Sequence, residues 1–209
     1  MSNRKKAIYI RFKRVLDVVF SLSLLAFLWF PMLAIAVAVR LDSEGDVIFK
    51  QKRIGKGGRA FECYKFRTMY AYAPHERPSA GFDDAHKYVT RVGGFLRKTS
   101  LDELPQLFNV LKGEMSIVGP RPLIIAEREI HEGRMRNGVY SLRPGITGLS
   151  QVSGRDRVSD ADKIRLDTQY ATSLSFSHDV RIVGMTVGRV LRGDGIASTF
   201  KKSGAPLDK

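Results

Sequence analysis

The sequence has 209 residues, enough for one domain with an appendage, and its 44% hydrophobic and 27% charged residues are ordinary for a globular chain. Its formal net charge of +14 is not ordinary, and such an excess predicts a polyanionic partner: nucleic acid, an anionic membrane surface or a phosphorylated substrate. The single cysteine, Cys63, excludes an intrachain disulfide, and we interpret it as a small buried hydrophobic side chain.

The N-terminal segment decides between these partners. Six basic residues come first, and residues 15–39 are then apolar except for three polar side chains and a central Pro31. This run is too long for the core of a cleaved signal peptide, and no small-residue cleavage site follows it. It predicts membrane residence, and basic residues clustered around an apolar segment argue against a nucleic-acid binder. Asp17 is one turn from Lys13 and Arg14, with which we expect it to pair at the membrane interface.

Two topologies are open for this segment. At about 1.5 Å per residue, its length gives roughly 37 Å, enough to cross a hydrocarbon core of about 30 Å. Pro31, however, lacks the N–H that would bond the carbonyl of Phe27, which predicts a kink. Basic residues also flank both ends, whereas a spanning helix has its excess on one side. A helix that enters, bends at Pro31 and leaves by the same face would keep this charge cytoplasmic, and these residues support the spanning and the re-entrant topology about equally.

After the apolar segment, the pattern predicts a small helix-rich α/β domain with a short hairpin or sheet. Two strands are expected at 47–49 and 60–66, around a basic, glycine-rich turn at 53–59. This turn is not a P-loop, because no Gly-Lys-Ser/Thr closes it. Residues 70–88 contain prolines, a glycine and small polar residues without periodicity, which predicts a loop.

The rest of the chain is expected to contain three helices and two rigid loops. The helices cover residues 100–113, with Gly113 as the stop, 123–137 and 180–191, and the loops cover 118–122 and 143–148. In the last helix, apolar residues at helical spacing oppose arginines. This pattern fits either a core helix or a helix that lies on the membrane.

Two adjacent acidic pairs occur, at 83–84 in the loop and at Asp102-Glu103. Ser100 and Glu103 have the S-x-x-E spacing of a capping box, which would place both carboxylates in the first turn of a helix. An alternative register begins the helix nearer Pro105. In either register the partial positive charge at the helix N-terminus keeps a carboxylate ionised, as a nucleophile or a metal ligand must be. The alternative interpretation is capping alone.

Several cations are candidates for contacts with phosphate, because arginine offers a bidentate fork to anions. They are Lys65, Arg67, Arg97, Lys98 and Arg121, the last between two prolines. Two vicinal carboxylates among these cations suggest a site for a diphosphate with Mg²⁺, which binds through one or two carboxylates plus substrate phosphates. The four histidines show no metal-ligand spacing.

Six motifs in fixed order resemble those of the bacterial sugar transferases, the monotopic phosphoglycosyl transferases. They are Lys13-Arg14…Asp17 before the apolar segment with its proline, FKQKRIG at 49–55, YKFRTM at 64–69, SLDELPQ at 100–106, SIVGPRP at 116–122 and RPGITGLSQ at 143–151. The resemblance covers roughly residues 10–195, nearly the whole chain. It implies a re-entrant membrane helix broken at Pro31 within residues 1–40, and a cytoplasmic, membrane-associated catalytic domain at 41–209. Many members have serine before this proline, where this chain has Phe30.

The resemblance also implies roles for individual residues. Asp102 matches the family's nucleophile, and Glu103 matches its partner acid, which is associated with Mg²⁺. Arg97 and Arg121 match positions linked to substrate phosphates. Three further cations in the motifs are expected to bind substrate: Lys65, Arg67 and Arg143.

The activity that the resemblance implies is transfer of a sugar-1-phosphate from a UDP-sugar to polyprenol (undecaprenyl) phosphate, with release of UMP through a covalent aspartyl intermediate. This would be the first membrane step of surface glycoconjugate or exopolysaccharide synthesis, on the cytoplasmic face of the bacterial inner membrane. A homo-oligomer is compatible with it. Two alternatives stay open: a membrane glycosyltransferase that breaks the anomeric bond and releases UDP, and a non-catalytic basic membrane anchor.

Overall fold

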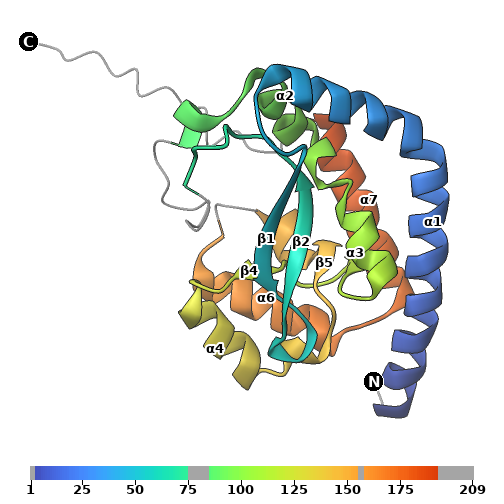
Figure 1. Ribbon diagram of the computed structural model, residues 1–209. Helices are drawn as coiled ribbons and strands as arrows, with labels where there is room; N and C mark the ends of the chain where they lie inside the picture. The colour runs from blue at the N-terminus through green and yellow to red at the C-terminus, as the bar shows by residue number, and fades with distance from the viewer. Residues whose placement is uncertain (1–2, 75–84, 155–157, 193–209) are drawn as a thin grey trace, which may run out of the picture.

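The computed structural model describes residues 3–74, 85–154 and 158–192 and has a helix-rich α/β arrangement with two small sheets and one long N-terminal helix (Figure 1). The predicted fold class is confirmed at this level. Most of the expected loop at 70–88, including the acidic pair at 83–84, lies outside the described residues.

Helix α1, Asn3–Asp42, contains Pro31 within its bounds. Among the described residues it is the one helix long and apolar enough to cross a membrane. Large apolar side chains along its middle are exposed, among them Phe27, Trp29 and Phe30. In Figure 1 the ribbon of α1 runs along one side of the molecule and then turns over its top. So much exposed apolar surface on one helix indicates membrane association.

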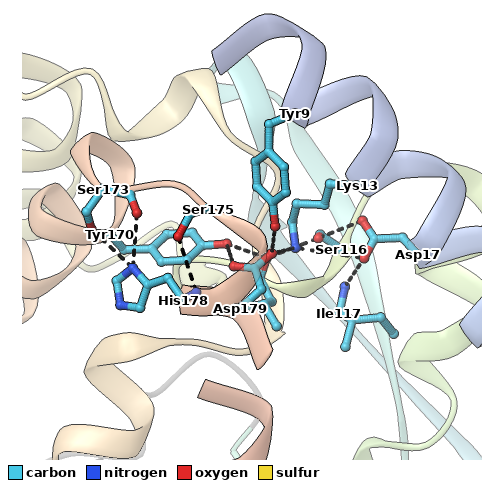
Figure 2. Close-up of polar contacts among 11 residues, drawn as sticks. Tyr9, Lys13, Asp17, Ser116, Ile117, Tyr170, Ser173, Ser175, His178 and Asp179 are labelled. Atoms are coloured by element: carbon cyan, nitrogen blue, oxygen red, sulfur yellow. Dashed lines mark hydrogen bonds and ion pairs between the residues drawn. The ribbon is translucent and has the colours of Figure 1, made fainter. Parts of the chain in front are cut away.

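The first turns of α1 are fixed to the rest of the chain by buried polar contacts (Figure 2). Tyr9 Oη and Lys13 Nζ both donate to Asp179 Oδ2, at 2.7 Å and 2.5 Å. Asp17 accepts from Ser116 Oγ at 2.7 Å and from the backbone N–H of Ile117 at 3.0 Å. Helix α7, Phe176–Arg192, and strand β3, Ser116–Val118, are therefore both attached to α1.

The expected pairing of Asp17 with its basic neighbours is a minor contact. Lys13 Nζ lies 4.0 Å from Asp17 Oδ1, farther than its contact with Asp179. Arg14 instead donates to the carbonyls of Val110 and Leu111 in the last turn of helix α3, Gln106–Lys112. Carbonyls there lack the usual partner one turn further along the helix, and that of Val110 also accepts from the cap residue Gly113. Asp17 is thus chiefly a buried acceptor for a strand, and the expected ion pair with Lys13 is present as a longer, secondary contact.

The far end of α1 contacts the same domain. Val39 is buried with Phe66 and Leu96 in one hydrophobic cluster, against which Met32 and Ile35 also pack. Arg67 joins this end to strand β2, because its guanidinium donates to the carbonyls of Val39 and Ser43. Both ends of the apolar helix therefore lie against one folded body.

The first sheet confirms the predicted hairpin. Strand β1, Ile48–Ile54, pairs antiparallel with β2, Ala60–Phe66, and β4, Leu123–Ile124, pairs with the other edge of β1. The turn contains a short 3₁₀ helix at Lys56–Gly58, in which Gly57 and Gly58 have positive φ. Glycine is favoured there because residues with a Cβ rarely adopt a backbone conformation with positive φ. Cys63 of β2 is buried, as predicted.

The second sheet corrects a prediction. Strand β5, Gly145–Thr147, pairs in parallel with β3, although residues 143–148 were expected to form only a rigid loop. The partner that makes it a strand is about 30 residues away and leaves no local pattern. A Cβ on Gly145 would lie 2.1 Å from the backbone N of Gly119, so only glycine allows this approach.

The helices surround these sheets (Figure 1). Their bounds are α2 Arg91–Thr99, α3 Gln106–Lys112, α4 Arg128–Arg136, α5 Leu149–Ser153 and α6 Asp160–Thr172, with 3₁₀ helices at Ala85–Tyr88, Leu101–Glu103 and Val139–Ser141. The predicted stop at Gly113 is confirmed, since this residue caps α3 with φ 83°. The helix expected over 123–137 begins only at Arg128, because residues 123–124 pair with β1 instead.

Helix α7 is confirmed, but its predicted apolar series does not form the core. Ile182 is buried with Tyr170 of α6 and Val118 of β3. The side chains of Val180 and Leu191 are 53% and 81% exposed. The expectation of a core helix built on the valine series is therefore wrong, because the buried stripe of α7 runs through Asp179 and Ile182.

Candidate active site

The two vicinal carboxylates lie in a tight turn between two helices. Asp102 and Glu103 belong to the 3₁₀ helix Leu101–Glu103, and α3 begins after Pro105. Ser100 has φ 59° and makes no capping hydrogen bond through its side chain. The capping-box register is therefore wrong, and the alternative start near Pro105 is right, because proline suits the start of a helix.

Lys65 lies between the two carboxylates. Its Nζ is 2.7 Å from Glu103 Oε1 and 3.9 Å from Asp102 Oδ2. Arg121, in the turn that follows β3, places its Nη1 4.0 Å from Glu103 Oε1. The structure thus brings together four predicted site residues from β2, the 3₁₀ turn and the turn after β3.

The charge state of Asp102 is set by opposing influences. Burial raises the pKa of this carboxyl, and the neighbouring carboxylate of Glu103 raises it as well. The positive charges of Lys65, Arg97 and Arg121 act in the opposite direction. The net pKa is above the ordinary value, and these three cations are the neighbours that favour the ionised form. An anion kept in this way is poorly hydrated, which suits a nucleophile.

A small pocket is lined by Glu103, by three cations and by two amides, together with apolar residues such as Ile146; the cations and amides are Arg53, Lys65, Arg121, Gln106 and Gln151. Arg53 belongs to the FKQKRIG motif but was not among the predicted site residues. Its guanidinium donates to the carbonyl of Pro122 at 3.0 Å and to Gln51 Oε1 at 2.5 Å. Burial, and secondly the nearby charge of Arg121, lower the pKa of Arg53 to about 10. Two neighbouring arginines give the pocket a preference for anions.

Two other predicted substrate-binding residues lie elsewhere. Arg67 holds the end of α1, through the carbonyls of Val39 and Ser43. Arg143 donates through Nε to the carbonyl of Gly113, just after α3, at 2.7 Å. Within the described part of the chain, both arginines are thus bound to backbone carbonyls and not to the carboxylate pair.

The oxygen ligands available for a magnesium ion come from the carboxylate pair. Within residues 3–74, 85–154 and 158–192, no three His, Cys, Asp or Glu side chains are grouped so that they could hold a metal by themselves. Asp102 and Glu103 provide two adjacent carboxylates, and Mg²⁺ commonly binds through one or two carboxylates together with substrate phosphates. The residues therefore fit an ion that is shared with a diphosphate.

Comparisons with known proteins identify the family of this chain. Residues 8–193 match the bacterial sugar transferase family. A UDP-galactose-lipid carrier transferase of Erwinia amylovora is 40% identical over 88% of this chain, and the match covers 41% of that protein. A UDP-glucose:undecaprenyl-phosphate glucose-1-phosphate transferase of Xanthomonas campestris is 41% identical over 86% of this chain and 38% of its own length.

Relatives of similar size also occur. The exopolysaccharide production protein ExoY of Rhizobium meliloti is 39% identical, over 88% of this chain and 87% of its own length. The chain thus spans about two fifths of the larger relatives and most of ExoY. Since the family match covers most of the sequence, the resemblance drawn from the motifs is confirmed, and the chain belongs to the bacterial sugar transferase family.

Proposed function

We propose that this protein transfers a sugar-1-phosphate from a UDP-sugar to polyprenol phosphate and releases UMP. The observation that carries the proposal is the carboxylate pair Asp102-Glu103, held by Lys65 and Arg121 in a member of this family. The names of the relatives, with a UDP-sugar donor, undecaprenyl phosphate as acceptor and exopolysaccharide as product, support these substrates and this pathway.

The first half-reaction uses Asp102 as the nucleophile. One carboxylate oxygen attacks the sugar-proximal phosphorus of the UDP-sugar. The bond from this phosphorus to the bridging oxygen breaks, and UMP leaves with that oxygen and the electron pair. The product is an acyl phosphate that joins Asp102 to the sugar phosphate, and the bond at the anomeric carbon stays intact.

In the second half-reaction, a phosphate oxygen of the polyprenol phosphate attacks the same phosphorus. The bond to Asp102 breaks, the carboxylate is regenerated and the product is a polyprenyl diphosphosugar. A covalent intermediate suits this pair of substrates, because a soluble donor and a lipid acceptor need not occupy the site at the same time.

The cations of the site offset the charge that gathers on the phosphoryl oxygens, which is the main requirement in phosphoryl transfer. Lys65 of β2 lies near both carboxylates, and Arg121 approaches Glu103 from the turn that follows β3. Mg²⁺ held by Glu103 and by the diphosphate would supply further positive charge. Arg97 influences Asp102 electrostatically and is assigned to the same phosphates.

The proposal includes a re-entrant α1, bent near Pro31, with the catalytic domain on the cytoplasmic face. Asp17 near the start of α1 and Val39 near its end contact the same folded domain. A straight spanning helix would separate these two ends by about 30 Å of hydrocarbon, so they could not both reach it. The exposed apolar stretch around Phe27 lies between them.

The outward face of α7 supports contact of this domain with the membrane surface. Its exposed apolar side chains, such as Val180 and Leu191, alternate with exposed arginines, such as Arg181. Amphipathic helices with basic polar faces bind at the headgroup region. We propose that α7 lies there.

The decisive experiment mixes purified enzyme with each of a series of UDP-sugars without polyprenol phosphate and quenches rapidly. About one UMP per active enzyme should appear. A digest made at acidic pH, which preserves the acyl phosphate, should contain a peptide with Asp102 that carries the added mass of a sugar phosphate. UMP that appears only after acceptor is added would replace the covalent step by direct transfer. Release of UDP would indicate a glycosyltransferase, and an Asp102→Asn variant that is fully functional in cells would indicate a membrane anchor.

A further inference from the structure

The segment Pro120–Pro122 brings Arg121 to the active site, and all three of its carbonyls accept hydrogen bonds from other elements. The backbone N of Gly145 donates to the carbonyl of Pro120 at 2.9 Å. Arg134 Nη1 donates to the carbonyl of Arg121 at 2.7 Å. Arg53 Nη1 donates to the carbonyl of Pro122 at 3.0 Å. Two of the three donors are guanidinium groups, whose hydrogen bonds are stronger than those of neutral donors.

Arg134 is the donor without access to solvent or substrate. It lies on α4, its residue is 2% exposed, and its Nη2 is 2.5 Å from Oδ2 of Asp167 on α6. The other oxygen of Asp167 accepts from Ser150 Oγ of α5 at 2.9 Å. The planar guanidinium therefore spans two acceptors, a carboxylate on one side and the carbonyl of Arg121 on the other.

Stability alone is a weak explanation for this buried pair. Replacing a buried ion pair by well-packed apolar residues is often neutral or stabilising, because two charges must be desolvated to form it. What apolar residues cannot replace is the hydrogen bond from Arg134 to the backbone of Arg121. A lysine would not serve equally well, because its ammonium group lacks a fixed fork that reaches both acceptors.

We propose that Arg134 is a positioning residue for phosphoryl transfer. By holding the carbonyl of Arg121, it sets the direction in which the Arg121 side chain leaves the backbone, towards Glu103 and the diphosphate. The inference rests on the proposed function for its substrate, but the backbone geometry that it describes does not depend on which sugar is transferred.

The test removes both buried charges together, because a single loss would leave an uncompensated charge in the core. The Arg134→Met/Asp167→Leu variant should keep the fold but lower kcat/KM for the UDP-sugar by about 10- to 100-fold, as expected for a displaced phosphate ligand. Its matched control is Arg165→Met/Asp162→Leu, the same chemical change in an exposed pair on α6, which should leave kcat/KM within about twofold.

A double-mutant cycle separates positioning from a general structural role. Arg121→Met should lower kcat/KM by about 100-fold in the wild type, but by only about 1- to 10-fold in the Arg134→Met/Asp167→Leu background, because that background has already lost part or all of the contribution of Arg121. Equal losses in both backgrounds would overturn the inference. If the double variant does not fold, Arg134→Lys, which keeps a positive charge beside Asp167, is used in the same cycle.

Hydrogen exchange gives a readout that is independent of activity. Backbone amides in the peptide covering residues 119–125 should exchange faster in the Arg134→Met/Asp167→Leu variant than in the wild type or in the Arg165→Met/Asp162→Leu control. Unchanged exchange would overturn the inference even if no UDP-sugar releases UMP. A wild-type enzyme without UMP release, together with faster exchange in the variant, would instead reject the proposed function and keep the positioning role.

Discussion

Lys65 offers the sharpest test of how the nucleophile is kept charged. Its Nζ lies 3.9 Å from Asp102 Oδ2, and the two side chains are 23% and 12% exposed. At this distance two unit charges attract by about 4 kcal/mol at an effective dielectric constant of 20, and by about 1 kcal/mol in bulk water. A partly buried pair falls between these limits, so Lys65→Met removes about 1 to 4 kcal/mol that favours the ionised Asp102.

The assay is kcat/KM for UMP release as a function of pH, which reports ionisations of the free enzyme. Because Asp102 must be ionised to attack, activity falls on the acid side, and burial places this limb above the usual pKa of an aspartate. Lys65→Met raises the pKa of Asp102 further, so the acid limb should move to higher pH by roughly 0.7 to 3 units. Lys65→Arg keeps the charge and should restore the wild-type limb.

Lys112→Met is the matched control, because Lys112 is exposed and bonds to Tyr64 Oη, away from the carboxylates. Its profile should coincide with that of the wild type. A Lys65→Met enzyme whose activity is lower by the same factor at every pH would refute the reasoning. Lys65 would then act only as a ligand for substrate, and the acid limb would belong to another group.

Three further predictions concern stability, the metal and topology. Asp102→Asn should abolish UMP release, yet it should raise the Tm at pH 8 and leave it unchanged at pH 3. Folding raises the pKa of Asp102, so this carboxyl lowers the stability of the wild type as the pH rises from its unfolded to its folded pKa. A lower Tm of the variant at pH 8, measured by calorimetry, would contradict this. EDTA should stop turnover and Mg²⁺ restore it, and Glu103→Gln should lose most activity while it still folds; undiminished turnover with chelator would exclude the metal. Cysteines substituted singly for Arg4 and Lys56 should both be protected from an impermeant thiol reagent outside the cell. Adding Pro31→Leu should expose one of them in some molecules, because it straightens the helix. Labelling of either cysteine without this substitution would reject the re-entrant helix.

Features with a local cause could be predicted from the sequence. The glycine-rich turn and its two strands follow from residue preferences over a few positions, and the stop at Gly113 follows from its left-handed conformation. Lys65 and Arg121 were expected at one site with the acidic pair, as cations for the phosphates of a substrate, but their contacts with Glu103 were not predicted.

Features with a distant cause could not be predicted. Strand β5 forms because it pairs with β3, which is far away in the sequence, so the residues around β5 do not predict it. The S-x-x-E spacing suggested a capping box, but the tight turn after α2 places Ser100 in a left-handed conformation that a capping residue does not adopt. Arg67 and Arg143 are of the residue type that commonly binds phosphate, and only the fold shows that they bind backbone carbonyls instead.

The contacts at the first turns of α1 make the membrane segment a part of the folding unit. A fragment that began after α1 would leave the buried carboxylate of Asp179 without two of its donors, Tyr9 and Lys13. The backbone N–H of Ile117 would lose its acceptor, Asp17, and an orphaned buried polar group destabilises a small domain substantially. No water-soluble catalytic fragment is therefore to be expected from this chain by trimming its anchor, and a detergent or lipid that disturbs α1 acts directly on the strand that leads to the active-site arginine.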